Sequence, residues 1–306
     1  MGQDNKFLVI VVGIPRGGKS VFKSINKYLI KPLGADLAIC SEEKYIENNP
    51  LSLQAKYLWN ISNDTNWDEY YQKFKNGNYK KYFEAGKKTG LENSGKIHFA
   101  MKDMILSNHI DTLEEYEFIV YTRFDQFHIR NHKLNFDKNI IYIQEGEDYG
   151  GINDRHSVIP SSYAKEYFDI CTYIDSSEAI LNIPKHPNCE SVFYQFLKDS
   201  KLTNIERFKR YQFTVLKIGD ITRWRIPTYK IHLSRKLFFK YPTEFLTSFK
   251  NLLIKHGVFK AAVSNPILSI NYLLLILRKN YSKFLPKTIK NYYGKSIANK
   301  KYFEKT

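Results

Sequence analysis

The sequence predicts an α/β fold, a sheet flanked by helices, with a basic helical segment after it. Short apolar runs at residues 7–12, 117–121 and 140–143 are rich in β-branched side chains, which is typical of buried strands. Segments between and after these runs place apolar residues at helical spacing, as residues 21–33 do. The positive charge is concentrated at the C-terminal end. Together these patterns indicate a folded enzyme-sized body with an appendage.

Length and composition limit the class of protein. A chain of 306 residues can bury a core of one large domain, or of one domain with an appendage. Aromatic residues make up 15%, which excludes disorder for most of the chain. The three cysteines, Cys40, Cys171 and Cys189, fit neither a zinc site nor a disulfide framework, so we expect a reducing compartment. The first apolar run has six residues and no cleavage pattern, which predicts a strand and not a signal peptide.

The charge divides the chain. The net charge is +16, yet residues 1–222 contain 29 Lys and Arg and 29 Asp and Glu. Residues 223–306 contain 18 Lys and Arg against only Glu244 and Glu304. This change in composition predicts a catalytic domain over residues 1–222 and a basic, amphipathic helical appendage over residues 223–306.

The first strand leads into a glycine-rich segment. Residues 13–20, GIPRGGKS, match the phosphate-binding pattern G-x-x-x-x-G-K-[ST] between a predicted strand and a predicted helix. In that interpretation the loop amides hold phosphates, Lys19 neutralises charge and Ser20 contacts Mg²⁺. The acidic strand that usually accompanies such a loop is lacking, unless the strand ending near Asp125 supplies it. A P-loop kinase or sulfotransferase-like enzyme is therefore the alternative function.

The remaining elements follow in order. The pattern predicts a strand at 35–40, several helices within 41–112, a helix at 161–173 capped by Ser161 or Ser162, a loop at 182–188, a helix at 190–202 and an edge strand at 211–218. We find no internal repeat and no low-complexity tract.

The most informative stretch is residues 140–159, IIYIQEGEDYGGINDRHSVI. Its apolar start predicts a strand, and charged residues then surround a glycine pair, Gly150–Gly151: Glu145, Glu147, Asp148, Asp154, Arg155 and His156. Glycines allow a sharp turn and the close approach of a ligand. In open α/β sheets ligands bind beyond the carboxyl ends of strands. The stretch therefore predicts a catalytic loop, and a solvated acidic turn with a helix cap is the alternative.

Three segments carry a family resemblance. Arg123-Phe124-Asp125, after a predicted strand, resembles the Arg-x-Asp variant of the Asp-x-Asp motif in GT-A-type, nucleotide-sugar-dependent glycosyltransferases. GGINDR at residues 150–155 resembles the Gly-Gly-x-Asn-Asp-Arg loop of bacterial and viral polysaccharide and lipopolysaccharide transferases. HPNCE at residues 186–190 resembles a His/Pro-x-Glu segment of the same group. The three lie in the family's order and cover roughly residues 115–200.

The resemblance implies a GT-A-like, Rossmann-like mixed sheet and a divalent cation, Mn²⁺ or Mg²⁺, that bridges the donor phosphates. Asp125 is then the metal ligand, with His156 as a second candidate, although a lone histidine is more often structural. Arg123 would contact phosphate or orient Asp125. Because Arg123-Phe124-Asp125 offers one acid where Asp-x-Asp offers two, a metal-independent mechanism remains open.

The resemblance also distributes roles among other residues. In a GT-A fold the loop after the first strand touches the donor nucleotide, which implies donor contacts from Gly13, Arg16 and Lys19. Arg155 and Glu190 are further donor-site candidates, and Glu190 has a helix-capping alternative. The catalytic base should be a carboxylate, and three are candidates: Glu147, Asp148 and Asp154. The Asn-Asp-Arg loop favours Asp154 for sugar binding.

The C-terminal quarter predicts a membrane surface contact. Residues 245–256 place apolar side chains on one helical face and lysines on the other. Residues 267–277 are strongly apolar but too short to span a bilayer, which requires ~20 residues. We expect an interfacial helix pair on anionic lipid. An ordinary helical subdomain with solvated lysines is the alternative, and nucleic acid has only the charge in its favour.

The expected function is sugar transfer from a nucleotide-sugar donor to a glycan or lipid-linked acceptor, in surface polysaccharide or lipopolysaccharide synthesis. The expected location is the cytoplasm, peripheral on the inner face of the membrane. The alternatives are the P-loop enzyme and a non-catalytic membrane-surface binding protein.

Overall fold

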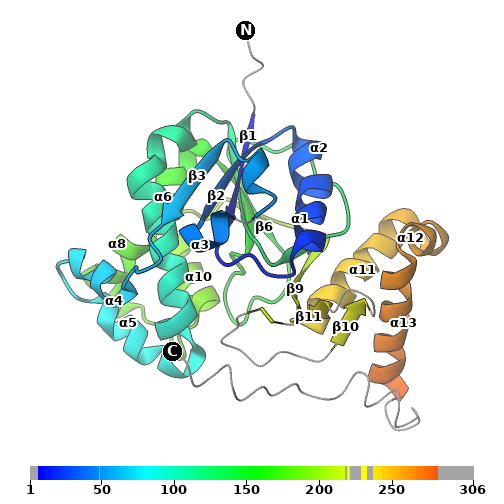
Figure 1. Ribbon diagram of the computed structural model, residues 1–306. Helices are drawn as coiled ribbons and strands as arrows, with labels where there is room; N and C mark the ends of the chain where they lie inside the picture. The colour runs from blue at the N-terminus through cyan, green and yellow to red at the C-terminus, as the bar shows by residue number, and fades with distance from the viewer. Residues whose placement is uncertain (1–5, 48, 218, 221–228, 233–236, 282–306) are drawn as a thin grey trace. The chain divides into compact units, whose positions relative to one another are not determined.

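A computed structural model describes residues 6–47, 49–217, 219–220, 229–232 and 237–281 (Figure 1). The chain divides into two compact units, and each is described by itself. Unit 1 comprises Met1–Ile14, Ile30–Arg123 and Lys133–Phe208; unit 2 comprises Pro15–Leu29, Phe124–His132 and Lys209–Thr306. The predicted boundary at residue 222 falls outside the described residues.

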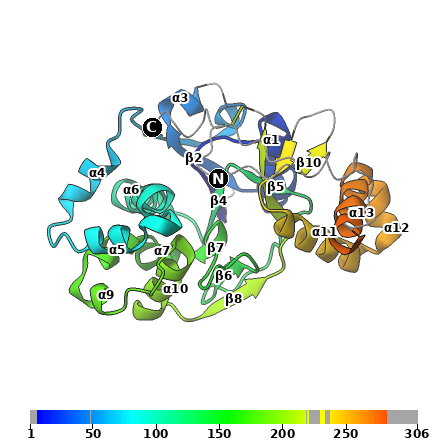
Figure 2. The ribbon, with the colours of Figure 1, turned by 90° about the horizontal axis from the view of Figure 1, so that it is seen from below.

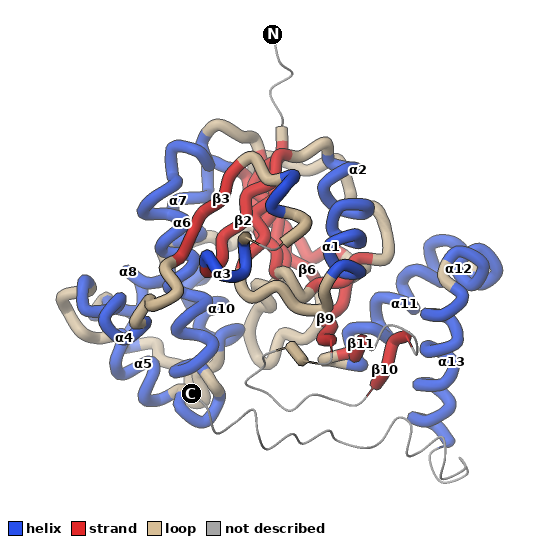
Figure 3. Tube along the Cα trace, viewed as in Figure 1, coloured by secondary structure: helices blue, strands red, loops and turns tan. Residues whose placement is uncertain are grey.

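Unit 1 contains a seven-stranded mixed sheet in the order β3-β2-β1-β4-β7-β6-β8. Figure 3 draws the strands in red, with β2 and β3 side by side. Its strands are β1 (Phe7–Val12), β2 (Asp36–Glu42), β3 (Tyr57–Ile61), β4 (Phe118–Arg123), β6 (Ile141–Gln144), β7 (His156–Pro160) and β8 (Ile205–Phe208). Only β7 is antiparallel to its neighbours. The predicted α/β class is confirmed: the sheet is mixed, mostly parallel and flanked by helices.

The sequence of β1 explains its central position. All six residues, FLVIVV, are buried, so both faces of the strand are covered. Parallel strands covered on both faces are near-continuous apolar runs, because neither face meets water. The prediction of a strand over residues 7–12 is therefore confirmed to the residue.

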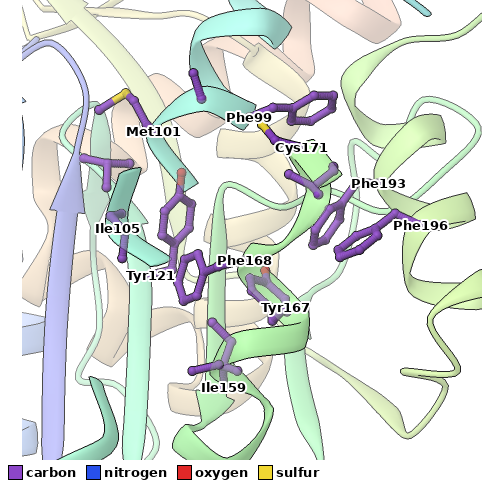
Figure 4. Close-up of a cluster of buried hydrophobic side chains, with 14 of the residues drawn as sticks. Phe99, Met101, Ile105, Tyr121, Ile159, Tyr167, Phe168, Cys171, Phe193 and Phe196 are labelled. Carbon is purple, nitrogen blue, oxygen red and sulfur yellow. The ribbon is translucent and has the colours of Figure 1, made fainter. Parts of the chain in front are cut away.

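Helices on one face of the sheet close the main core of unit 1. They include α6 (Lys96–Glu114), α7 (Ala164–Phe168), α8 (Ile170–Asp175) and α10 (Cys189–Asp199). Figure 2 shows α6, α7 and α10 gathered beside β4, β7 and β6. Figure 4 shows Phe99 of α6, Tyr121 of β4 and Phe193 of α10 in one apolar cluster. Shorter helices complete the unit: α2 (Lys31–Leu33), α3 (Glu43–Ile46), α4 (Trp67–Tyr70), α5 (Tyr79–Ala85) and α9 (Ser177–Leu181).

Unit 2 contains a four-stranded antiparallel sheet in the order β10-β11-β9-β5. Its elements are α1 (Lys19–Ile25), β5 (Gln126–His128), β9 (Gln212–Lys217), β10 (Tyr229–His232), β11 (Leu237–Phe239), α11 (Pro242–His256), α12 (Val258–Ser264) and α13 (Pro266–Tyr281). Aromatic rings join sheet and helix: Phe245 of α11 stacks on Phe239 at 4.1 Å and meets Phe213 edge-on at 5.0 Å, between ring centroids. The predicted amphipathic helix over residues 245–256 is confirmed.

The structure corrects several predicted elements. β3 lies in the segment where only helices were predicted, because Tyr57–Ile61 is a half-exposed edge strand that lacks a continuous apolar run. β7 is a strand where the sequence pattern predicts part of a loop. The reason is that it begins with His156 and Ser157, which are polar but buried. β9 is an interior strand and not an edge strand. The helix predicted from residue 161 begins as a 3₁₀ turn without a side-chain cap, so neither Ser161 nor Ser162 caps it.

Candidate functional site

The order of the seven strands defines one place on the sheet for a ligand. From β1 the chain moves to β2 and β3 on one side, whereas β4 lies on the other side of β1. Ligands in open α/β sheets bind at such a reversal, outside the carboxyl ends of the strands. Val12 and Arg123, the last residues of β1 and β4, are register partners. We call this side of the sheet the carboxyl edge.

The connection between β6 and β7 lies at the same edge. β7 runs antiparallel to β4, and its first residue, His156, pairs with Thr122 near the end of β4. β6 runs antiparallel to β7 and therefore ends at the carboxyl edge as well. The β6–β7 loop, residues 145–155, carries all three candidates for the catalytic base, Glu147, Asp148 and Asp154, together with Arg155. Asp154 leads into β7, whereas the sequence pattern placed it after a strand.

The β6–β7 loop has an unusual backbone. Two non-glycine residues adopt positive φ angles, Glu147 at 57° and Tyr149 at 44°. Such conformations cost of order 1–3 kcal/mol each and persist only where the surroundings enforce them. Asn153, fully buried, supplies part of that enforcement: its Nδ2 donates to the Gly146 carbonyl at 3.0 Å, and its Oδ1 accepts from the Arg155 amide at 3.0 Å.

Asp148 braces the loop from inside. Its Oδ1 accepts from the Asn153 amide at 3.0 Å and from Arg207 Nη2 at 2.7 Å. Arg207 also donates to the Gln144 carbonyl at 2.7 Å, which ties β8 to the end of β6. The neighbouring Glu147 accepts from the Tyr149 hydroxyl. Both residues therefore have partners within unit 1, and their role as catalytic base stays a prediction.

Gly151 is required where the loop meets α10. A Cβ on Gly151 would lie 2.0 Å from the Glu190 carbonyl oxygen, so only glycine fits. Ile152 N donates to that same oxygen at 3.0 Å, and Asn188 Nδ2 donates to the Tyr149 carbonyl at 2.9 Å. Asn188 also caps α10 in a reciprocal pair with Ser191. Two of the three segments that carry the family resemblance thus contact each other directly.

An ion pair reinforces this contact. Arg155 Nη2 lies 3.0 Å from Glu190 Oε1, and both side chains are largely buried. Burial raises the pKa of Glu190, and the positive charge of Arg155 opposes that rise. The structure therefore brings together two predicted donor-site residues and neutralises each with the other. Their geometry suits orienting the loop.

A second buried pair holds Asp154. Lys102 of α6 is fully buried, and its Nζ lies 3.1 Å from Asp154 Oδ2. The ammonium also lies 4.0 Å from the Phe193 ring centroid and 4.6 Å from that of Tyr167. Burial lowers the pKa of Lys102, while Asp154 acts to raise it. Cation–π contacts and an ion pair together stabilise a charge that would otherwise be costly to bury.

The neighbouring groups determine the charge of Asp154. Burial raises its pKa, but the interactions with Lys102, His98 and Arg123 outweigh burial and lower it overall. Asp154 is therefore ionised at neutral pH. A carboxylate held in this state is a weak base and a strong, fixed hydrogen-bond acceptor. Because Thr122 and His156 are register partners, Arg123 and Asp154 each lie within two residues of this pair, at the same edge of the sheet.

The remaining predicted residues of unit 1 have structural contacts. Gly13 donates its amide to the Cys40 carbonyl at 3.1 Å and accepts from Ser41 Oγ at 2.9 Å, which joins the ends of β1 and β2. His156 is fully buried, and its ring packs edge-on against Phe208 at 5.7 Å between centroids. Its role as a metal ligand stays a prediction.

Other predicted residues belong to unit 2. Arg16 Nη1 lies 3.3 Å from Asp125 Oδ2, and Asp125 is 1% exposed. The backbone carbonyl of Asp125 accepts from Val215 N at 2.9 Å, which ties the residue to β9. Lys19 is exposed at the start of α1. Within unit 2 the structure thus pairs Asp125 with one predicted donor-site cation and leaves the other in solvent.

The glycine-rich segment packs tightly within unit 2. Gly17 has a φ of 72°, and a Cβ on it would lie 2.3 Å from Val21 Cγ2. Its amide donates to Asp220 Oδ2 at 2.8 Å, and the same oxygen accepts from Lys217 N. The Gly17 amide, which would donate to phosphate in a P-loop, therefore donates to the carboxylate of Asp220. This arrangement favours a packing role for Gly17 over a phosphate cradle.

A metal ion at the predicted site would need several ligand side chains close together. Among the residues that the structure describes, no three His, Cys, Asp or Glu side chains gather as ligands for a metal ion. Asp125 faces the guanidinium of Arg16. The divalent cation stays a prediction.

Sequence reasoning missed Lys102, Asn153 and His98. Lys102 and Asp103 stand inside the apolar stretch FAMKDMIL of a long helix, and charges at buried positions of a helix are a usable signal. Asn153 lies within the recognised GGINDR segment but was given no role of its own. His98 carries no local signal.

No protein-family model matches the chain, and a comparison with curated proteins finds no relative.

Proposed function

We propose that the chain is a glycosyltransferase that moves a sugar from a nucleotide-sugar donor to a glycan or lipid-linked acceptor, in the synthesis of a surface polysaccharide or lipopolysaccharide. One observation carries the proposal. Arg123 lies at the carboxyl edge beside the end of β1, where the strand order reverses, and the ionised Asp154 lies at the same edge in the loop that leads into the neighbouring strand β7. Donors of this class carry a diphosphate and a polyhydroxylated sugar, which need a cation and a fixed acceptor.

In the proposed reaction an acceptor hydroxyl attacks the anomeric carbon of the donor sugar. The bond from that carbon to the diphosphate oxygen breaks, and the diphosphate leaves with the electron pair. Arg123 stabilises the developing negative charge. Asp154 accepts hydrogen bonds from sugar hydroxyls and orients the ring. The hydroxyl proton passes to a carboxylate base, for which Glu147 and Asp148 remain candidates, whereas the interactions that lower the pKa of Asp154 weaken it as a base.

Calorimetric titration of nucleotide sugars into the full chain tests this function. Wild type should bind at least one donor, and Asp154→Asn should retain most of that affinity while losing roughly 10²–10⁴ in turnover. Asp111→Asn, an exposed acid on α6, is the matched control and should change neither. Equal turnover in wild type and Asp154→Asn would remove the assignment.

The divalent cation has its own test. If Asp125 holds Mn²⁺ or Mg²⁺, Asp125→Ala should abolish metal-dependent donor binding. If arginines neutralise the diphosphate instead, donor affinity in wild type should be unchanged by chelator, and Arg123→Ala should weaken it tenfold or more. The two results exclude each other.

Lys19→Ala separates the proposal from the P-loop alternative. A sugar transferase should lose little activity, because no transferred phosphate depends on this exposed ammonium. Lys23→Ala, exposed on the same helix, is the control. Near-complete loss of activity and of ATP binding in Lys19→Ala alone, with the fold intact, would support the P-loop enzyme.

A further inference from the structure

The C-terminal helices of unit 2 leave an unusual amount of apolar surface uncovered. Eight of the fourteen large apolar side chains that are exposed in the described chain lie between residues 254 and 277. Phe259 of α12 is 82% exposed and Val258 is 71% exposed. Scattered single exposures are normal, but contiguous apolar patches on soluble proteins mark interaction sites. These helices therefore present a binding face.

The exposed side chains form an ordered stripe. On α13, Ile270, Leu273 and Leu277 follow at intervals of three and four residues and are all exposed. Leu268 and Leu275 face the other way and are buried. Tyr272 packs on Phe249 of α11 at 5.1 Å between ring centroids. The inner face of α13 is thus already occupied, and the outer stripe is a second apolar face that the described residues of unit 2 leave in solvent.

The charge around this face has one sign. Lys250, Lys255 and Lys260 are exposed, and the sequence contains no Asp or Glu from residue 245 to residue 303. The preceding acid, Glu244, is buried, and its Oε1 lies 3.2 Å from Arg210 Nη1. A partner for this face must therefore combine apolar depth with negative charge.

Length and shape distinguish these helices from a straight membrane-spanning helix. No single helix among the described residues is long and apolar enough to cross a bilayer. α12 and residues 266–277 of α13 pass that test only together, and they meet at a bend of 119° (Figure 3). Helices of this kind, with an apolar face and flanking lysines, lie in the plane of a membrane surface.

We propose that α11–α13 bind the surface of an anionic lipid bilayer. The apolar side chains of α12 and α13 enter the boundary between headgroups and acyl chains, and the lysines contact the anionic headgroups. A second copy of the chain is a poorer partner, because two such faces would bring lysines together with no exposed acid to pair with them. The proposal does not depend on sugar transfer.

Flotation of the full chain with lipid vesicles tests the proposal. Wild type should bind vesicles with 30 mol% phosphatidylglycerol at low salt and should bind phosphatidylcholine vesicles at least tenfold more weakly. Phe259→Asp with Ile270→Asp should abolish binding. Leu181→Asp on α9 is the matched control, because Leu181 is 84% exposed in unit 1, and it should bind as wild type does.

The lysines provide a graded test. Each lysine near an anionic surface contributes about fivefold in binding, so Lys255→Ala with Lys260→Ala should weaken binding about 25-fold and flatten its salt dependence. Equal binding by wild type and both double variants, or no binding at low salt, would overturn the proposal. A different pattern would also overturn it: the wild type forms dimers, the double variant Phe259→Asp with Ile270→Asp is a monomer, and neither binds vesicles. The face would then join two copies of the chain. Donor binding, measured on the same variants, should be unchanged.

Discussion

Two regions of this molecule depart from the usual distribution of side chains, and they do so in opposite ways. Near Asp154 in unit 1, charges lie in the interior; on α12 and α13 in unit 2, apolar side chains lie in solvent. The buried charges are balanced within the chain, because Lys102 and Asp154 pair. The exposed apolar stripe has no comparable cover in the described chain. Buried charges that pair with each other indicate a site within the protein. Exposed apolar side chains without cover indicate a surface for a partner.

The largest expected effect comes from unbalancing the buried charges. Lys102→Met removes the cation that pairs with Asp154 and should destabilise the fold by about 3 kcal/mol, because an unpaired charge stays buried. Lys102→Met with Asp154→Asn should recover most of that loss, since both charges are then gone. Urea denaturation of the four proteins in this cycle measures both changes. A loss below about 1 kcal/mol in the single variant would mean that Asp154 is not held mainly by Lys102.

A slightly smaller effect is expected where the β6–β7 loop packs on α10. Gly151→Ala places a Cβ against backbone and should cost about 2–3 kcal/mol, the upper range for overpacking. Gly150→Ala is the control: its Cβ would meet open space, so only its φ of 84° is strained, at about 1 kcal/mol. Equal midpoints in thermal denaturation would contradict the packing described for Gly151.

Acid should reveal the charge on Asp154. Its pKa in the folded protein lies below the ordinary value, so it contributes stability above about pH 4 that is lost as pH falls through the folded pKa. Lys102→Met removes a lowering charge, so the loss should begin at higher pH. Unfolding free energies of wild type and Asp154→Asn between pH 2.5 and 7 measure this contribution. A difference that is constant with pH would contradict it.

The smallest effect should come from the exposed stripe. Phe259→Ser should change stability by less than about 0.5 kcal/mol, because its ring is in solvent. Phe245→Ala on α11 is the contrasting variant, since Phe245 is fully buried and should cost about 3–5 kcal/mol. If Phe259→Ser costs as much as Phe245→Ala, the stripe is part of the core, and the contrast between the two regions is lost.

The sequence predicted those parts of the fold that depend on local pattern. Local pattern predicted the positions of three strands and one helix. The strands β1, β4 and β6 are apolar runs, and α10 has apolar residues at helical spacing. The sequence pattern did not predict β7 as a strand, because its first two residues are polar and its burial depends on neighbours distant in the chain. Unit 2 escaped as a unit because three separate segments build it, and no local pattern links α1 to β9.

The candidate site divides in the same way. The charged loop, its glycine pair and the segment at residues 186–190 were recognised by composition and resemblance. The pairing of Arg155 with Glu190 and of Lys102 with Asp154 was not, because each joins residues that are far apart in sequence. Sequence reasoning identified the acids of the site, but only the structure shows their partner cations.

Unit 2 is built from three separate segments of the chain, and this has a consequence for its synthesis on the ribosome. β5 pairs with β9, and Gln126 Nε2 donates to Thr214 Oγ1 across 88 positions of sequence. At translation rates of roughly 5–20 residues per second, β5 waits about 4–18 seconds for its partner strand. α11, which covers β9 through Phe245, is synthesised later still. Until β9 is made, α1 and β5 are open to chaperones and proteases, and a chain that stops before residue 212 leaves them so permanently.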